Sequence, residues 1–347
     1  MIRVGIAGTG TMAHSHARAL TAMRGVRLEA ACDLREDAGQ SFARTYRIPQ
    51  IYTSIDEMVK RADIEAVICV ASDSAHAPIS LAAIRAGKHV LCEKPLAVNH
   101  ADARKMAQAA KRKGVVHMVN FSYRNAPAIH HAAKLISEGA IGTPRHVHGS
   151  YLQSWLVQDK WGDWRKELNR LWRLSSKHGS LGVLGDLGVH LLDFATFPIG
   201  PVASVRCKLK TFPKHPRNRI GEYVLDANDS AVITVEFKNG SLGVLHTSRW
   251  TAGYINRVAA EFYGEEGGIR VDLDKSTHEI QICRGQDLER SAWKIRRSPK
   301  TPSVWTRFFH SIRNGGQEQP DFARGAEIQK ILDACLVADR EDQTVRV

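Results

Sequence analysis

The stretch Gly8-Thr9-Gly10-Thr11-Met12-Ala13 decides the fold, because it lies between an apolar run at Ile2–Ala7 and a helix-like segment at Met12–Met23. It has the G-x-G-x-x-G/A form, in which the first glycine permits a tight turn and the second lets the backbone approach a pyrophosphate. The small third residue allows close packing of helix on strand. The start of such a helix offers free N–H groups and a partial positive charge to phosphates.

Strands and helices alternate through the first third of the chain. A capping box at Ser54–Glu57 opens one helix. Strands that are apolar on both faces and separated by helices are typical of a parallel sheet covered on both sides. We therefore predict a doubly wound parallel (Rossmann) sheet in residues 1–122, with strands at Arg27–Cys32, Ala66–Val70, His89–Cys92 and Val115–Val119, and helices at Ala77–Ala86 and Ala101–Lys113, the latter capped by Asn99.

The period changes to an alternating pattern from Val202 onward. Long alternating strands indicate an open, mostly antiparallel sheet, which needs helices or a second subunit to cover its apolar face. The predicted class is α/β plus α+β, with a substrate-binding and oligomerisation domain at residues 123–347. Its strands are expected at Val202–Phe212, Ser230–Phe237, Ser241–Trp250, Arg257–Tyr263, Ile269–Leu273 and Glu279–Cys283, and its helices at Pro127–Glu138, Asp186–Phe197, Val304–Arg313 and Ala323–Arg340.

Composition narrows the class of protein. The 347 residues carry a net charge of +13, but the basic residues are scattered and do not interleave with aromatics, so we expect no nucleic-acid partner. No run approaches the roughly 20 apolar residues of a membrane span, and a strand begins at once after Met1, so we expect a cytoplasmic protein with no membrane partner. The 6 cysteines have no metal-ligand spacing, which predicts reduced, buried thiols and no metal.

The residues after the second strand bear on the choice of dinucleotide. Asp33 stands at the strand end, where a carboxylate accepts hydrogen bonds from the adenosine ribose and repels a 2′-phosphate. This favours NAD. Arg35, two residues later, could pair with a 2′-phosphate and leaves NADP open.

Two further segments identify a family. Residues 86–97 contain Glu93-Lys94-Pro95, and residues 182–193 contain Asp186-Leu-Gly-Val-His190. With the glycine motif, they resemble the Gfo/Idh/MocA family of NAD(P)-dependent sugar and inositol dehydrogenases, over the whole chain. The resemblance and the strand ends imply a cofactor site made of Gly8, Gly10, Thr11, Met12, Asp33, Arg35, Ala71, Ser72, His76, Glu93, Lys94, Asn120, Trp172 and Arg173.

The residues of these motifs suit hydride chemistry. Lys94 follows a parallel strand, at the edge where open sheets bind ligands, and an ammonium group there would polarise a reacting oxygen. Asp186 and His190 are four residues apart, so in a helix they share one face. An imidazole can take the proton of a secondary alcohol. The resemblance makes His190 the general acid/base, Lys94 its proton-relay partner and Asp186 a positioning group.

Other candidates line the expected substrate pocket. We expect Tyr123, Arg124 and Tyr151 to bind substrate together with Lys94, Asp186 and His190. Residues 156–177 show no clean period and are expected to form an ordered substrate loop. Trp161 and Trp164 are consistent either with an aromatic wall beside Tyr151 or with core packing. Many family members carry three glycines where this chain reads His178-Gly-Ser-Leu-Gly182, so the pocket edge is expected to differ in shape.

The resemblance is compatible with more than one function. The first is oxidation of a secondary hydroxyl on a monosaccharide, sugar derivative or inositol. The alternative is a glycoside hydrolase that retains NAD, oxidises a hydroxyl transiently and eliminates the aglycone, with a tyrosine such as Tyr151 or Tyr123 as second base. A ligand sensor would predict a broken Lys–Asp–His set, and here the set is intact. Family resemblance also suggests a homodimer or homotetramer formed through the open sheet.

Overall fold

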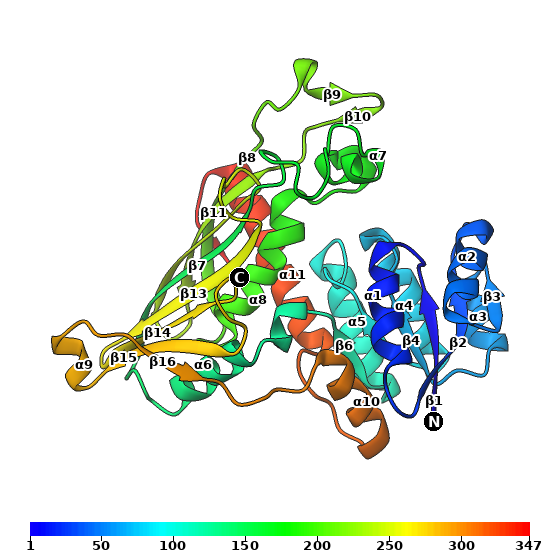
Figure 1. Cartoon of the computed structure of the whole chain (residues 1–347), viewed down its shortest axis with the longest axis horizontal. Coiled ribbons are helices and arrows are strands. Elements are labelled where there is room, and N and C mark those ends of the chain that lie inside the picture. Colours follow the sequence, from blue (N-terminus) through cyan, green and yellow to red (C-terminus); the bar gives the residue numbers. More distant parts are fainter. The chain divides into compact units, whose positions relative to one another are not determined.

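The computed structural model describes residues 1–347, the side chains of Leu168 and Asn169 apart. The chain divides into two compact units. The first comprises residues 1–122 and 302–329, and the second comprises residues 123–301 and 330–347. Figure 1 shows the elements of each unit along the chain.

The first unit contains a six-stranded, wholly parallel sheet in the order β3-β2-β1-β4-β5-β6. This is the dinucleotide-binding order, which confirms the predicted Rossmann sheet. The strand bounds are β1 (Ile2–Ala7), β2 (Val26–Cys32), β3 (Gln50–Tyr52), β4 (Ala66–Cys69), β5 (His89–Cys92) and β6 (His117–Val119).

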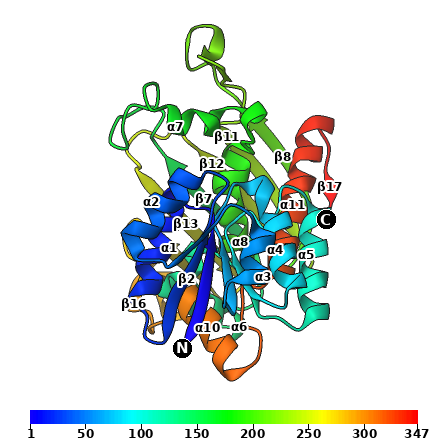
Figure 2. The same ribbon diagram turned by 90° about the vertical axis from the view of Figure 1, so that its right-hand side faces the viewer.

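Helices connect these strands, and capping residues set both ends of helix α5 (His100–Lys113). Asn99 accepts a hydrogen bond from the Asp102 N–H over 2.8 Å, and Gly114 ends the same helix in the left-handed conformation. Figure 2 shows α1 and α2 on one side of the sheet and α3, α4 and α5 on the other. The bounds are α1 (Thr11–Thr21), α2 (Glu36–Tyr46), α3 (Ile55–Arg61), α4 (His76–Arg85) and α5 (His100–Lys113). Neither α2 nor β3 was predicted, since α2 is rich in polar residues and β3 has only 3 residues.

A C-terminal segment also belongs to the first unit, which differs from the expected division into 1–122 and 123–347. Helix α10 (Val304–Asn314) buries Val304, Phe308 and Phe309 completely in the core beside Ala13 and Ala17 of α1. Three such side chains contribute several kcal/mol of apolar burial. The later helix α11 (Phe322–Glu341) spans the unit boundary.

The second unit is built on a nine-stranded, mostly antiparallel sheet in the order β16-β15-β14-β13-β7-β12-β11-β8-β17. The central strand β7 was not predicted, and it runs parallel to β12. The bounds are β7 (Pro144–Gln153), β8 (Val202–Lys210), β11 (Ser230–Phe237), β12 (Leu242–Ser248), β13 (Asn256–Gly264), β14 (Gly267–Asp272), β15 (Glu279–Arg284), β16 (Lys294–Arg297) and β17 (Val345–Arg346), with a separate ribbon of β9 (Arg219–Ile220) and β10 (Tyr223–Val224).

Helices cover one face of this sheet (Figure 1). Helix α8 (Val189–Thr196) contacts β7, β12 and β13, and α6 (Pro127–Ser137) contacts β14 and β15. On β11, residues alternate between buried and exposed, so the other face stays open. The short helices are α7 (Leu168–Leu171) and α9 (Gln286–Glu289).

Among the residues described, no helix combines the length and apolar character needed to cross a bilayer. The cysteines are all buried and free of disulfides.

Candidate active site

The glycine loop after β1 is shaped for close backbone approach. Gly8 has φ +91°, and a Cβ there would lie 2.6 Å from the backbone nitrogen of Ala71. Gly10 is the N-cap of α1, where a Cβ would meet nothing within 4 Å and no described side chain caps the helix. The helix start therefore faces open space with uncapped N–H groups, as a dinucleotide pyrophosphate requires. Thr11 and the half-exposed Met12 flank it.

Asp33 lies at the end of β2, against this loop. Its Oδ2 accepts hydrogen bonds from the Thr9 N–H over 2.9 Å and the Thr9 hydroxyl over 2.7 Å, and its Oδ1 accepts one from the Arg35 N–H over 3.0 Å. Burial alone would raise the pKa of Asp33, but these hydrogen bonds outweigh it and lower the pKa. The carboxylate is anionic and fixed to the loop, and a carboxylate has about four acceptor positions. The Arg35 side chain is 72% exposed.

A buried network lies directly before Lys94. Glu93 Oε1 accepts from His16 Nε2 over 2.8 Å and from Asn120 Nδ2 over 2.6 Å, while Trp305 Nε1 donates to His16 Nδ1 over 3.1 Å. Burial would raise the pKa of Glu93, but the hydrogen bonds and the charges of His16 and Lys94 lower it to about 2. A fixed anion therefore lies at the strand end that carries Lys94.

His76 joins two loops of the predicted cofactor site. Its Nδ1 lies 2.7 Å from the Pro95 carbonyl and its Nε2 3.1 Å from the Ala71 carbonyl. The ring is fully buried and lies between the loop of Ala71 and Ser72 and the cis Lys94–Pro95 segment. The sequence predicted His76 in the cofactor site.

In the second unit, Asp186 lies in a π-helical turn, Leu184–Gly188, that leads into α8. Asn228 anchors this turn, because its carbonyl accepts from the Val183 N–H and its Oδ1 from the Leu184 N–H. A Cβ on Gly185 would collide with the Leu181 side chain. Helical π-turns recur at functional sites, where they redirect a side chain.

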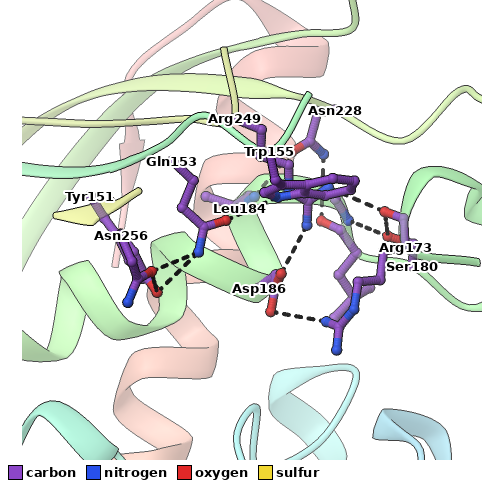
Figure 3. Close-up of polar contacts among 12 residues, drawn as sticks. Tyr151, Gln153, Trp155, Arg173, Ser180, Leu184, Asp186, Asn228, Arg249 and Asn256 are labelled. Carbon is purple, nitrogen blue, oxygen red and sulfur yellow. Dashed lines mark hydrogen bonds and ion pairs between the residues drawn. The ribbon is translucent and has the colours of Figure 1, made fainter. Parts of the chain in front are cut away.

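Two arginines hold the Asp186 carboxylate (Figure 3). Arg249 Nη2 donates to Oδ2 over 2.9 Å, and Arg173 Nη1 lies 3.5 Å from Oδ1. Arg249 also donates from Nη1 to the Arg173 carbonyl over 3.2 Å and stacks on the Trp155 ring at 5.0 Å. Burial lowers the pKa of Arg249 and the Asp186 charge opposes that effect. Arg249 was not predicted as a site residue, because a single arginine at a strand end belongs to no motif.

Side chains with hydroxyl and amide groups lie near His190 in the second unit. The Tyr123 ring centroid lies 4.9 Å from that of His190, and the Tyr151 ring 6.2 Å from it. The two tyrosine hydroxyls are 2.7 Å apart, and Tyr151 donates to Asn256 Oδ1 over 2.8 Å. Gln153 Nε2 donates to the same Oδ1, as Figure 3 shows. Asn256 and Gln153 were also missed, and both lie on strands that pair in register.

Two residues considered for the substrate pocket, Arg124 and Trp164, are buried and contact other side chains of the second unit. Arg124 is buried in a two-fold ion pair with Asp193, at 2.7 and 2.8 Å, and its guanidinium lies 3.4 Å from the Phe197 ring centroid. This geometry favours a structural role over substrate binding. Trp164 is fully buried in a cluster with Trp155 and partly buried Trp161, so its surroundings favour core packing.

Trp172 and Arg173 were expected at the cofactor. The structure places Arg173 beside Asp186 and 4.7 Å from the Trp172 ring. Residues 178–182 form the loop where many family members carry three glycines. This loop is bound to Arg173, because the Ser180 hydroxyl donates to the Arg173 carbonyl over 2.6 Å. Lys94 lies at the carboxyl edge of β5, and its partial exposure agrees with an accessible ammonium.

Both units of the chain match known protein families. Residues 2–121 match a family described as "Oxidoreductase family, NAD-binding Rossmann fold", and residues 129–270 match "GFO/IDH/MocA C-terminal domain". The levoglucosan dehydrogenase of Pseudarthrobacter phenanthrenivorans is 29% identical over 394 residues, covering 100% of this chain and 98% of the relative. Glucose-6-phosphate 3-dehydrogenase of Bacillus subtilis is 29% identical over 361 residues, with 100% and 99% covered.

A solved structure agrees with the fold as a whole. Levoglucosan dehydrogenase in complex with NADH and levoglucosan has a TM-score of 0.88 and 27% identity, and the match covers 100% of this chain and 99% of that one.

Proposed function

Since the chain belongs to the Gfo/Idh/MocA family of NAD-dependent oxidoreductases, we propose that it oxidises a secondary hydroxyl of a cyclic sugar or inositol. The single observation that carries this proposal is the arrangement around Asp186. A carboxylate held by buried Arg249 lies on the element that leads to His190, beside a tyrosine pair. Such a group can bind and deprotonate a hydroxyl.

The roles follow from the chemistry of each group. His190 takes the proton of the reacting hydroxyl, and Lys94 assists by polarising the same oxygen. Asp186 accepts a hydrogen bond from a neighbouring hydroxyl, because its carboxylate oxygens are held in place by Arg249 and Arg173. Bound NAD supplies the hydride acceptor.

The substrate class follows from the polar side chains near His190. Tyr123, Tyr151, Gln153 and Asn256 form a hydrogen-bonded group, which suits a ring with several hydroxyls rather than an apolar alcohol. The names of the relatives support a monosaccharide, sugar phosphate or anhydrosugar.

The test is absorbance at the reduced-nicotinamide band with NAD or NADP and a panel of inositols, aldoses, sugar phosphates and anhydrosugars. We expect a signal with one class of polyol. Lys94→Ala and His190→Ala should abolish it. Lys111→Ala and His310→Ala, on exposed helix surfaces, should not. Activity in His190→Ala equal to that of the parent protein would contradict the proposed roles.

The hydrolase remains the second candidate, because Tyr151 lies beside His190. Burial above all, with the Tyr123 hydroxyl and the Asp186 charge, raises the pKa of Tyr151 well above its usual value. A phenol held neutral in this way is a poor base at neutral pH, which favours the dehydrogenase. The hydrolase would be favoured instead if no polyol of the panel gave a signal although NAD was bound, and if the protein then released the phenol of an aryl glycoside.

We also propose that two copies pair through the open face of the large sheet. Val232 on β11 is 53% exposed and Leu242 on β12 is 56% exposed, and apolar side chains on a broad face favour burial in an interface. Light scattering should give at least a dimer mass. Val232→Glu with Leu242→Glu should lower it to that of one chain, whereas a monomeric parent protein would contradict the proposal.

A further inference from the structure

Three ligand-type side chains meet inside the first unit, although the sequence spacing indicated no metal site. Cys69 ends β4 and Cys92 ends β5, and the two residues lie directly opposite each other in the parallel register. His76 begins α4. One ligand atom from each of these residues lies within 4.8 Å of the other two.

The cluster is closed to solvent. Cys69 and Cys92 are 0% exposed and His76 is 1% exposed. Ser80, one turn along α4 from His76, is also 0% exposed, and its hydroxyl borders both thiols. The site therefore offers two sulfurs, an imidazole nitrogen and a hydroxyl oxygen in a dry interior.

The surroundings of His76 match those of a metal-bound histidine. Both ring nitrogens face backbone carbonyls, at 2.7 Å from Pro95 and 3.1 Å from Ala71. A neutral imidazole has a single N–H and can donate to only one of them. The shorter contact assigns the proton to Nδ1, which leaves a lone pair on Nε2. Metal-binding histidines have this pattern, in which one nitrogen donates to a carbonyl and the other binds the ion.

The charges of the three ligand groups also suit a divalent ion. Two thiolates and a neutral imidazole around a divalent cation have no net charge, so the complex avoids the cost of a buried unpaired ion. Sulfur and nitrogen ligands in a tetrahedral set select zinc over magnesium or calcium.

We propose that Cys69, His76 and Cys92 bind one Zn²⁺ per chain, with Ser80 Oγ as a fourth ligand. Binding releases the thiol protons, and the ligands draw together to zinc–sulfur distances of about 2.3 Å. The loops of Ala71–Ser72 and Glu93–Lys94 directly follow the two cysteines in the chain. The ion would therefore tie together the strand ends that support the predicted cofactor site, independently of the reaction catalysed there.

The test uses untagged, reduced, chelator-treated full-length protein titrated with Co²⁺ and then Zn²⁺. We expect thiolate-to-cobalt absorption in the near ultraviolet that saturates at one equivalent and is abolished by Zn²⁺. Cys69→Ser and Cys92→Ser should each lose most of this absorption. Cys32→Ser is the matched control, since Cys32 is a buried cysteine at the end of strand β2 of the same sheet, and it should keep the signal.

Absorption that is absent in the parent protein, or that is equal in Cys69→Ser and Cys32→Ser, would overturn the proposal. X-ray absorption of the zinc-loaded parent protein gives a second readout that needs no variant. We expect a shell with two sulfur neighbours, and a shell of nitrogen and oxygen alone would place the ion on surface histidines and overturn the proposal. Neither readout depends on catalytic activity.

Discussion

Arg249 donates from Nη2 to Asp186 Oδ2 over 2.9 Å while its side chain is completely buried. Its other contacts are the Arg173 carbonyl and the Trp155 ring. A buried guanidinium needs a carboxylate partner, so the two charges stabilise each other. This pair sets the position and the charge of Asp186.

Replacing Arg249 should therefore impair catalysis through Asp186. Arg249→Gln removes a charge-assisted hydrogen bond that contributes about 1.5–3 kcal/mol, so we expect kcat/KM to fall roughly 10–100-fold. The measurement is kcat/KM with the polyol substrate.

Arg173→Gln is the matched comparison, since Arg173 is 40% exposed and lies 3.5 Å from the same carboxylate. Its effect on kcat/KM should be clearly smaller. An equal loss in both variants would count against a positioning role for Arg249.

The two loop glycines should separate folding from cofactor binding. Gly8→Ala places a Cβ against the backbone of Ala71 at a positive φ, so we expect it to lower the free energy of unfolding by about 2 kcal/mol or more. Gly10→Ala meets open space and should fold normally. Its methyl group occupies the cradle before α1, so NAD affinity should fall at least tenfold.

Chemical denaturation and NAD titration of the two variants test this pair. Loss of stability in Gly10→Ala with unchanged NAD affinity would contradict the assignment of this loop to the pyrophosphate.

Glu93 should contribute to stability above its unfolded-state pKa. Its folded pKa of about 2 lies below the ordinary value of 4.5. The contribution is therefore fully present above about pH 4.5 and is lost as pH falls toward 2. Glu93→Gln should lower the free energy of unfolding by about 1–3 kcal/mol at pH 7, and by much less near pH 3.

The control is Glu138→Gln, which changes an exposed carboxylate near Lys134 and should shift stability by less than about 0.5 kcal/mol. The measurement is chemical denaturation of both variants at several pH values. A loss of unfolding free energy in Glu93→Gln that does not change with pH would contradict the link between stability and the pKa of Glu93.

Asp33 should determine the choice between NAD and NADP. Asp33→Asn keeps an acceptor for Thr9 but removes the charge that repels a 2′-phosphate, while exposed Arg35 lies nearby. We expect the ratio of kcat/KM for NADP to that for NAD to rise at least tenfold. Adding Arg35→Ala should reverse most of the gain. An unchanged ratio would assign discrimination to other residues.

Local patterns alone predicted the first sheet and its cofactor loop. Gly8 and Gly10 form the turn between an apolar run and the helix that follows it, and Asn99 caps its own helix α5. Such effects depend on residue type and spacing, so they can be read along the chain. The segments around Lys94 and His190 identified the family for the same reason.

Contacts between distant residues depended on the tertiary structure. Arg249 reaches Asp186 because the strand end that carries it packs on the π-turn, and Arg124 pairs with Asp193. Cys69 and Cys92 meet only through the register of β4 with β5. Spacing along the chain determines which residues share a helix face or a strand, whereas strand order, register and packing determine which distant side chains touch.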